Sequence, residues 1–217
     1  MTGVKVKNLS IRFDGNEVIK DLNLDVIEGE FLVLLGPSGC GKSTLLRMVA
    51  GLEAITAGEI VIGDRVVNEL EPKDRDIGMV FQNYALYPQM SVFGNMAYGL
   101  KIRGFKKSDI DARVKRAAEI LELGPMLGRK PRQLSGGQRQ RVAIARALAV
   151  EPSVILAAEP IPMLDVSIRI GILNPILQLK RELGIAFLST THALASARYA
   201  ASGGPRVVPR TITGQGP

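Results

Sequence analysis

Residues 36–43 carry the strongest chemical pattern in the sequence, Gly-Pro-Ser-Gly-Cys-Gly-Lys-Ser, which matches G-x-x-x-x-G-K-[ST]. The pattern follows a short apolar run and precedes an expected helix. Small residues let successive backbone N–H groups turn inward around phosphate oxygens, and the helix N-terminus adds partial positive charge. The sequence therefore predicts a phosphate-binding loop, formed by Gly36, Pro37, Ser38, Gly39, Cys40, Gly41, Lys42, Ser43 and Thr44.

Within this loop, residue types suggest separate roles. Lys42 is expected to bridge the β- and γ-phosphates, the Ser43 hydroxyl to ligate Mg²⁺, and Thr44 to donate on the α-phosphate side. ATP and Mg²⁺ are thus the expected cofactors. Cys40 stands at a helix N-terminus, which makes a thiol more acidic, but we interpret it as a small spacer. A glycine turn with a chance lysine is disfavoured by the strand before the loop and the helix after it.

A second pattern begins at Leu134, with the string Leu-Ser-Gly-Gly-Gln followed by Arg-Gln-Arg-Val-Ala-Ile-Ala-Arg up to Arg146. At a helix N-terminus, Ser135, Gly136 and Gly137 present a hydroxyl and bare N–H groups to an anion, with Gln138 next to them. The alternative is the simple N-cap of an amphipathic helix. That alternative leaves two consecutive glycines at a helix start unexplained.

With these two strings the sequence resembles the ABC transporter ATPases, over about residues 4–199. In that family the anion at the second pattern is the γ-phosphate of ATP bound to the other subunit's phosphate loop. The resemblance implies a homodimer or heterodimer of ATPase subunits, transmembrane permease partners, and a peripheral location on the cytoplasmic face of the membrane. Residues 1–150 resemble sugar and polyol importer ATPases, whereas residues 151–199 are more similar to those of peptide importers.

The resemblance also implies roles for five further residues. Phe13 matches the aromatic residue on which adenine stacks, although a core phenylalanine is an alternative because strand residues alternate faces. Gln82 resembles the glutamine that reaches Mg²⁺ and the attacking water. Glu159 resembles the catalytic carboxylate that polarises this water, and Asp165 matches the aspartate of a loop that crosses between subunits. His192, the single histidine, resembles the switch residue that contacts the γ-phosphate.

One position departs from the family in a way that bears on catalysis. The family places an aspartate, which orients Mg²⁺ through its water shell, where Ala158 stands. Pro162 and Ala193 depart from the pattern as well. The hypothesis is a nucleotide-binding subunit of an importer with impaired hydrolysis. The alternative is a hydrolysis-deficient regulatory or truncated nucleotide-binding subunit that pairs with an active homologue.

The elements that must position these residues follow from hydrophobic periodicity. Residues 4–27 alternate as antiparallel strands, and residues 31–35, 153–157 and 185–190 are short apolar runs typical of buried parallel strands. Helical patterns occur between residues 91 and 132, with a capping box expected at Ser108 and Asp111, and from Ser135 to Ala149. The predicted fold is α/β: a P-loop, RecA-like core with a mainly parallel sheet, an N-terminal antiparallel β subdomain and an inserted α-helical subdomain.

This pattern predicts one domain over residues 1–200, with a core from 1–86 and 134–200 and a helical subdomain from 87–133. Residues 201–217 contain four glycines and three prolines without periodicity, and they are expected to form a disordered tail.

Composition restricts the class of protein. The 217 residues are 46% apolar and 23% charged, as in a soluble globular protein, and a single cysteine excludes an intramolecular disulfide. No run reaches the 18 apolar residues of a membrane span, so membrane association is expected through partners and the isolated chain is expected to be soluble. The net charge of +7 allows a third class, an ATPase of nucleic-acid repair or translation. Aromatic residues make up only 5%, which disfavours a stacking platform, and a nucleic-acid partner is not expected.

Overall fold

The computed structural model describes residues 3–13, 16–37, 39–158, 184–191 and 206–209. The chain divides into two compact units. The first, called the sheet unit, contains Met1–Met79, Ser153–Glu159 and Leu179–Pro217. The second, called the helical unit, contains Val80–Pro152 and Pro160–Gln178.

An antiparallel sheet opens the sheet unit. It consists of β1 (Val4–Phe13), β2 (Asn16–Val26), β4 (Ala57–Ile62) and β5 (Arg65–Val66), in the order β2-β1-β4-β5. Apolar residues alternate along β1 and β2, and the side chains at alternate positions are buried, as expected for a sheet with one face on the core. The antiparallel pair expected from residues 4–27 is confirmed.

A mainly parallel sheet forms the centre of the same unit. Its strands are β6 (Ile77–Val80), β7 (Val154–Ala158), β8 (Ala186–Thr191), β3 (Phe31–Leu35) and β9 (Arg206–Pro209), in that order. β3 pairs in parallel with β8 and β9, and β7 pairs in parallel with β8. The three apolar runs therefore form the buried parallel strands that the sequence predicts, and the α/β class is confirmed.

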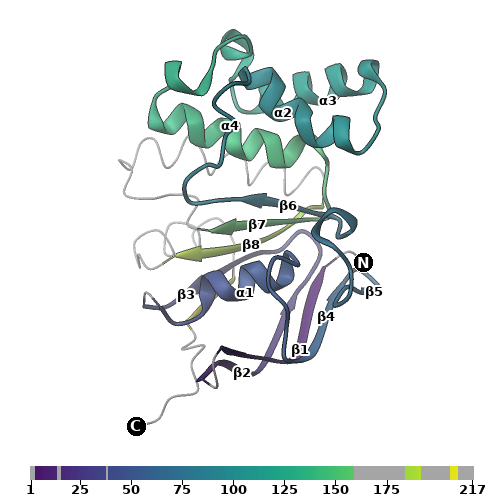
Figure 1. The fold of residues 1–217 in the computed structure, drawn as a ribbon, viewed down its shortest axis with the longest axis vertical. Coiled ribbons are helices and arrows are strands. Elements are labelled where there is room, and N and C mark those ends of the chain that lie inside the picture. The colour runs from purple at the N-terminus through teal and green to yellow at the C-terminus, as the bar shows by residue number, and fades with distance from the viewer. Residues whose placement is uncertain (1–2, 14–15, 38, 159–183, 192–205, 210–217) are drawn as a thin grey trace. The chain divides into compact units, whose positions relative to one another are not determined.

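Helix α1 (Lys42–Val49) packs between the two sheets (Figure 1). Four of its side chains, Leu45, Leu46, Met48 and Val49, are buried in one core cluster with apolar residues of both sheets. Because α1 follows β3 after only six residues, this packing fixes the loop between them at the carboxyl end of β3. A short 3₁₀ turn, η1 (Pro72–Asp74), precedes β6.

The helical unit contains α2 (Val92–Ile102), α3 (Lys107–Ile120) and α4 (Gly136–Ala149), which pack on one another (Figure 1). Two 3₁₀ turns, η2 (Gly124–Met126) and η3 (Pro131–Gln133), connect α3 to α4. The helical pattern of residues 91–132 and the helix from Ser135 are confirmed. None of the helices within the described ranges is long and apolar enough to cross a membrane.

Two local predictions are wrong. The capping box at Ser108 is absent, because the Lys106 carbonyl already accepts from the N–H groups of Asp109 and Ile110 and starts the helix before Ser108. The Ser108 hydroxyl instead donates to the Asp109 carboxylate at 3.3 Å.

The expected disordered tail is wrong for Arg206–Pro209, which form strand β9 beside β3. Val207 and Val208 are β-branched residues that favour a strand, and β3 supplies the backbone partners. The sequence does not reveal this pairing, because four residues among glycines and prolines show no period.

Candidate nucleotide-binding site

The loop between β3 and α1 has the backbone of a phosphate-binding turn. Gly39 and Gly41 have φ angles of 83° and 86°, a left-handed conformation that strains residues with a Cβ. At Gly39 no described atom lies within 4 Å of the position where a Cβ would stand, so the backbone conformation rather than packing requires this glycine. Ser38 lies outside the described residues.

The side chain of Lys42 folds into this loop and is 6% exposed. Its Nζ donates to the carbonyl oxygens of Gly36 and Pro37, both at 2.7 Å, and contacts the Sγ of Cys40 at 3.3 Å. The ammonium group is therefore held by the loop itself, at the start of a helix whose N-terminus already favours anions. Cys40 is buried and packs as a small residue, as the spacer interpretation expects.

Two hydroxyl groups follow Lys42 in the first turn of α1. The side chain of Ser43 is exposed, and Thr44 is partly buried. The N-cap of α1 is Gly41, and no side chain in the described part of the loop accepts from the first N–H groups of the helix. The start of α1 thus combines N–H groups that no described side chain caps, a lysine and a hydroxyl group in one turn.

The second pattern lies at the start of α4, in the helical unit. The Ser135 hydroxyl accepts from the Gln138 N–H at 3.3 Å, and the Gln138 Oε1 accepts from the Ser135 N–H at 2.9 Å, which completes a capping box. The Nε of Arg139 donates to the carbonyls of Pro131 and Leu134, both at 3.1 Å, and holds the chain that enters the helix.

Gly136 is the first residue of α4 and is exposed. No described atom stands within 4 Å of a Cβ built there, and its φ is not left-handed. Neither packing within the described chain nor backbone conformation therefore requires a glycine at this position. A bare backbone here fits the close approach of a group from outside the chain.

Gln82 is exposed and follows β6 by two residues. The segment after it is fixed by Arg146 of α4, whose guanidinium donates to the carbonyls of Ala85 at 2.6 Å and Tyr84 at 3.2 Å. Tyr84 and Ala85 both have positive φ angles, so these bonds hold a backbone that would otherwise be unfavourable. Burial lowers the pKa of Arg146, although a guanidinium stays charged at neutral pH. The helix that begins with the second pattern therefore also anchors the segment after Gln82.

Asn95 of α2 holds the same segment at Tyr87, two residues after Ala85. Its fully buried amide accepts from the Tyr87 N–H at 2.8 Å and donates to the Tyr87 carbonyl at 3.1 Å. Neither Arg146 nor Asn95 was singled out from the sequence. Their roles depend on contacts across the unit, and only the helical position of Arg146 could have suggested an inward-facing charge.

A buried arginine that the sequence analysis also missed supports α1 from its other end. The Arg75 guanidinium is 4% exposed and donates to the Met48 carbonyl at 2.8 Å and the Val49 carbonyl at 3.1 Å, both in the last turn of α1. Burial lowers the pKa of this group. A Cβ at Gly51 would stand only 2.6 Å from its Nε, so Gly51 makes room for the arginine. Arg75 therefore satisfies the carbonyls at the end of the helix that carries Lys42.

The carboxyl edge of the parallel sheet bears on metal binding. Ala158 ends β7, and its methyl group offers no ligand. Glu159, Asp165 and His192 lie outside the described residues, and for Phe13 only the backbone is described, at the end of β1. Within the described ranges, no group of three or more His, Cys, Asp or Glu side chains could hold a metal ion. The described residues therefore fit an Mg²⁺ ion carried mainly by phosphate oxygens, with the Ser43 hydroxyl as a protein ligand.

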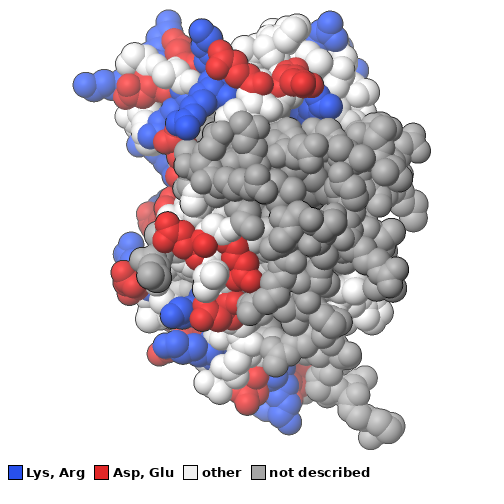
Figure 2. Space-filling view, turned by 180° about the vertical axis from the view of Figure 1, so that it is seen from behind, with Lys and Arg blue, Asp and Glu red and all other residues white. Residues whose placement is uncertain are grey.

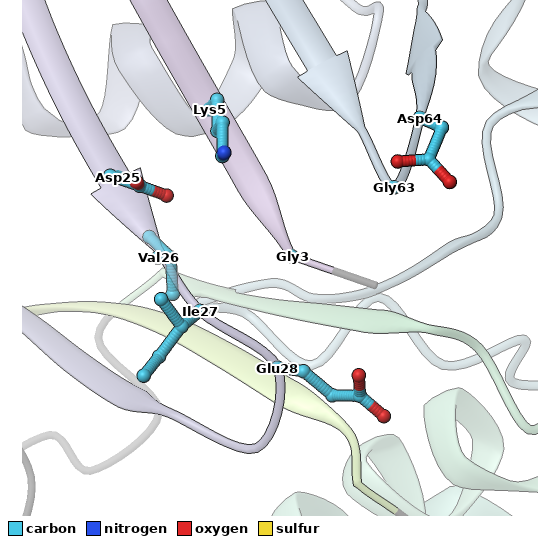
Figure 3. Close-up of a pocket in the computed structure, with 8 residues that line it drawn as sticks. All are labelled: Gly3, Lys5, Asp25, Val26, Ile27, Glu28, Gly63 and Asp64. Carbon is cyan, nitrogen blue, oxygen red and sulfur yellow. The ribbon is translucent and has the colours of Figure 1, made fainter. Parts of the chain in front are cut away.

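A cavity of about 640 Å³ lies elsewhere in the sheet unit (Figure 3). Its lining includes Lys5, Asp25, Ile27, Glu28 and Asp64. Residues Val26–Glu28 precede β3, whereas the phosphate loop follows the opposite end of this strand. The cavity is therefore distinct from the candidate nucleotide site.

Basic and acidic side chains lie interspersed on the face shown in Figure 2. This distribution agrees with a net charge of +7 that is spread along the chain. The nucleic-acid class gains no support from this face, because binding to a phosphate backbone uses clustered lysine and arginine residues.

Comparison with known proteins decides the family. A family model described as ABC transporter matches residues 19–162, which include both patterns and Gln82. The chain belongs to the ABC transporter family. The first pattern then corresponds to the P-loop of this family, and the second to its signature motif.

Curated relatives of this ABC protein include the sn-glycerol-3-phosphate import ATP-binding proteins UgpC of Cupriavidus pinatubonensis and Rhodopseudomonas palustris. The first is 59% identical over 193 residues, which are 88% of this chain and 52% of the relative. The second is 60% identical over 193 residues, covering 88% of this chain and 54% of the relative. The chain therefore spans about half the length of these relatives.

Among solved structures, two dimeric forms of the ABC cassette MJ0796 are similar to this chain, one of them bound to ADP and Pi. Each has a TM-score of 0.79 and 34% sequence identity, and the match covers 90% of both chains. The fold is thus that of an ATP-binding cassette, in agreement with the resemblance found in the sequence.

Proposed function

We propose that this chain is the ATP-binding subunit of an ABC importer, which couples ATP binding and hydrolysis to solute uptake through a membrane permease. The observation that carries the proposal is the P-loop, in which Lys42 lies inside a turn of left-handed glycines at the start of α1. The relatives are named sn-glycerol-3-phosphate import ATP-binding proteins, which supports a sugar or polyol cargo. The ATPase domain is proposed to span residues 1–200, with residues 87–133 as its helical subdomain.

In this proposal each element of the P-loop has one task. Backbone N–H groups of the loop surround the phosphate oxygens, as a glycine-rich turn before a helix allows. The Lys42 ammonium, which now donates to two loop carbonyls 2.7 Å away, donates to the β- and γ-phosphates when ATP is bound. Phe13 stacks on the adenine.

Ser43 and Gln82 are the proposed protein ligands of Mg²⁺. The metal neutralises phosphate charge when it is bound. Gln82 also holds the attacking water, Glu159 polarises it, and His192 contacts the γ-phosphate; these roles rest on the family resemblance. Arg146 keeps the segment after Gln82 in place during this step.

The signature motif is proposed to act in a dimer, with a second copy or a homologous ATPase subunit. Ser135, Gly136, Gly137 and Gln138 then contact the γ-phosphate of ATP in the partner's P-loop, and Asp165 lies near the dimer interface. The dimeric structures of MJ0796 support this arrangement, as does the bare backbone at Gly136. Membrane association is proposed to be peripheral, on the cytoplasmic face and through the permease.

A second function is favoured by Ala158. Without a carboxylate at this position, no negative side chain orients the waters of Mg²⁺ or balances its charge. ATP then still binds, but hydrolysis is slow or absent. The chain would then be a hydrolysis-deficient regulatory subunit that pairs with an active homologue, and its intact signature motif would complete the homologue's site.

The test compares ATP binding and turnover of the wild-type chain with those of Ala158→Asp. The added carboxylate is expected to raise the ATPase rate at least about tenfold while ATP affinity changes little. The reason is that a carboxylate beside the metal stabilises the transition state more than it stabilises bound ATP. Ala158→Asn is the matched control, since its side chain is as large as that of aspartate but carries no charge, and it is expected to leave the rate unchanged.

The outcomes separate the two functions. A wild-type chain that hydrolyses ATP as fast as Ala158→Asp contradicts impaired turnover and supports the active importer subunit. A wild-type chain that does not bind ATP contradicts both functions.

A further inference from the structure

Thr190 has a buried hydroxyl for which the described residues provide no hydrogen-bond partner. The residue is 1% exposed, and its Oγ1 finds no donor or acceptor within the described part of the chain. An unpaired buried hydroxyl is costly, and most buried polar atoms in native proteins are paired. A valine would occupy the same volume in a strand without this cost. We therefore expect the hydrogen-bond partner of this hydroxyl to lie outside the described residues.

The sheet register places Thr190 next to the departure at Ala158. In the parallel sheet Thr190 pairs with Ala158 of β7 on one side and with Leu34 of β3 on the other. Residues in register on neighbouring strands project from the same face. Leu34 is followed, two residues later, by the first glycine of the P-loop. Thr190 thus lies at the carboxyl edge of the sheet, between the P-loop strand and the strand in which alanine replaces the family's aspartate.

The core cluster shows from which face of the parallel sheet Thr190 projects. Ala186 and Leu188, four and two residues before Thr190, belong to the core cluster that includes α1. Because strand residues alternate between faces, Thr190 projects on the same side as these two. Ala158 packs against the same cluster. The Thr190 hydroxyl and the Ala158 methyl therefore lie on the same side of the sheet as helix α1.

We propose that Thr190 is a positioning residue, whose hydroxyl contacts the water shell of the Mg²⁺ ion that accompanies ATP. The inference rests on the proposed function. Mg²⁺ keeps several of its waters in proteins, and such waters need polar partners. A hydroxyl group both donates and accepts, so it suits a metal-bound water, whereas the methyl of Ala158 does not. Thr190 thus takes over the contact to the water shell that the family assigns to the aspartate.

This replacement of a carboxylate by a hydroxyl has a chemical consequence. A neutral hydroxyl orients a water molecule but adds no negative charge to balance the metal. Orientation supports binding of the Mg²⁺–ATP complex, and charge balance is required for the transition state of phosphoryl transfer. The site of this chain is therefore adapted to hold Mg²⁺–ATP more than to hydrolyse it.

The experiment measures the affinity for ATP with Mg²⁺ and with EDTA, and takes the ratio of the two. Thr190→Val is expected to lower this ratio about fivefold, the worth of one ordinary hydrogen bond, through a loss confined to the Mg²⁺ condition. Thr190→Ser keeps the hydroxyl and is expected to keep the ratio. Thermal unfolding without nucleotide serves as the folding control, and Thr190→Val is expected to melt no lower than the wild type.

The Ala158→Asp background gives a second, independent readout. If Thr190 takes the place of the carboxylate, Thr190→Val should change the ratio by less than about twofold in this background, because the charged group makes the stronger contact. A ratio that Thr190→Val leaves unchanged in the wild-type background overturns the inference. So does an equal loss of affinity in Mg²⁺ and in EDTA, which would show a structural role. If the wild-type chain binds ATP in neither condition, the proposed function itself fails.

Discussion

Two helix starts carry the chemistry of this chain, and they satisfy their first N–H groups in different ways. At α1 the N-cap is Gly41, in a left-handed conformation, and the described loop provides no side-chain acceptor. At α4 the Ser135 hydroxyl and the Gln138 amide accept from each other's backbone and close a capping box. The first start leaves its donors for a ligand, whereas the second is a complete helix start without one.

This difference indicates which parts of the site one chain can form alone. The P-loop contains its own lysine, held within the loop, so it should bind ATP in a single chain. The signature motif needs no ligand for its folding, and its exposed Gly136 has no structural reason inside the described chain. Its contribution should therefore appear only when a partner's nucleotide approaches.

The largest effect is expected at the P-loop. Lys42→Ala removes the ammonium group, and ATP affinity of the single chain should fall at least about a hundredfold, because charge-assisted hydrogen bonds to phosphate are strong. Titration with a fluorescent ATP analogue measures the change. The exposed Lys101 of α2 supplies the control, since Lys101→Ala should leave the affinity unchanged. Equal affinities of Lys42→Ala and the wild type would show that the nucleotide binds elsewhere.

A smaller effect, and one visible only in the dimer, is expected at Gly136. The space at this position accepts a methyl group, so Gly136→Ala should fold normally, with a stability equal to the wild type or up to about 1 kcal/mol higher. The same methyl would stand between the helix start and the partner's γ-phosphate. ATP-dependent dimerisation, measured by analytical ultracentrifugation, should weaken at least about tenfold, the effect of losing close backbone contacts to an anion.

Gly128 is the matched control for this test. It lies in the same unit, its φ is not left-handed, and no described atom stands within 4 Å of a Cβ built there. Gly128→Ala should therefore leave both stability and dimerisation unchanged. If the two variants dimerise equally well with ATP, the signature motif does not approach the partner's phosphate as proposed.

The sequence predicts the elements of this fold well where hydrophobic runs are uninterrupted. The strands β3, β7 and β8 come from apolar runs bounded by turn residues, and each is found within one residue of its expected position. Strand β9 was missed because its order depends on a neighbour, β3, rather than on a pattern of its own. The start of α3 was misplaced because a backbone carbonyl, not a serine, begins the helix.

For the site, the sequence predicts the residues that belong to short motifs and misses those that act through tertiary contacts. The left-handed glycines and Lys42 lie in one contiguous string, so their roles follow from spacing alone. Arg146 contacts a segment about sixty residues earlier in the chain, as its bonds to Tyr84 and Ala85 show. The proposed role of Thr190 depends on its pairing with Ala158 on the neighbouring strand. No pattern in the sequence indicates this pairing.

The smallest effect is expected at Ser135, and it separates capping from ligand binding most directly. Ser135→Ala removes the acceptor for the Gln138 N–H and should lower the free energy of unfolding by about 1 kcal/mol, as the loss of an N-cap usually does. Ser91 caps α2 in the same unit by the same kind of bond, from the Gly94 N–H at 3.0 Å, so Ser91→Ala should cost a similar amount. ATP binding by the single chain should stay unchanged in both variants, and only Ser135→Ala should weaken the ATP-dependent dimer. If both variants lose stability equally and dimerise equally, Ser135 acts only as a helix cap. The glycines that follow it would then be the part of the motif that contacts the partner's nucleotide.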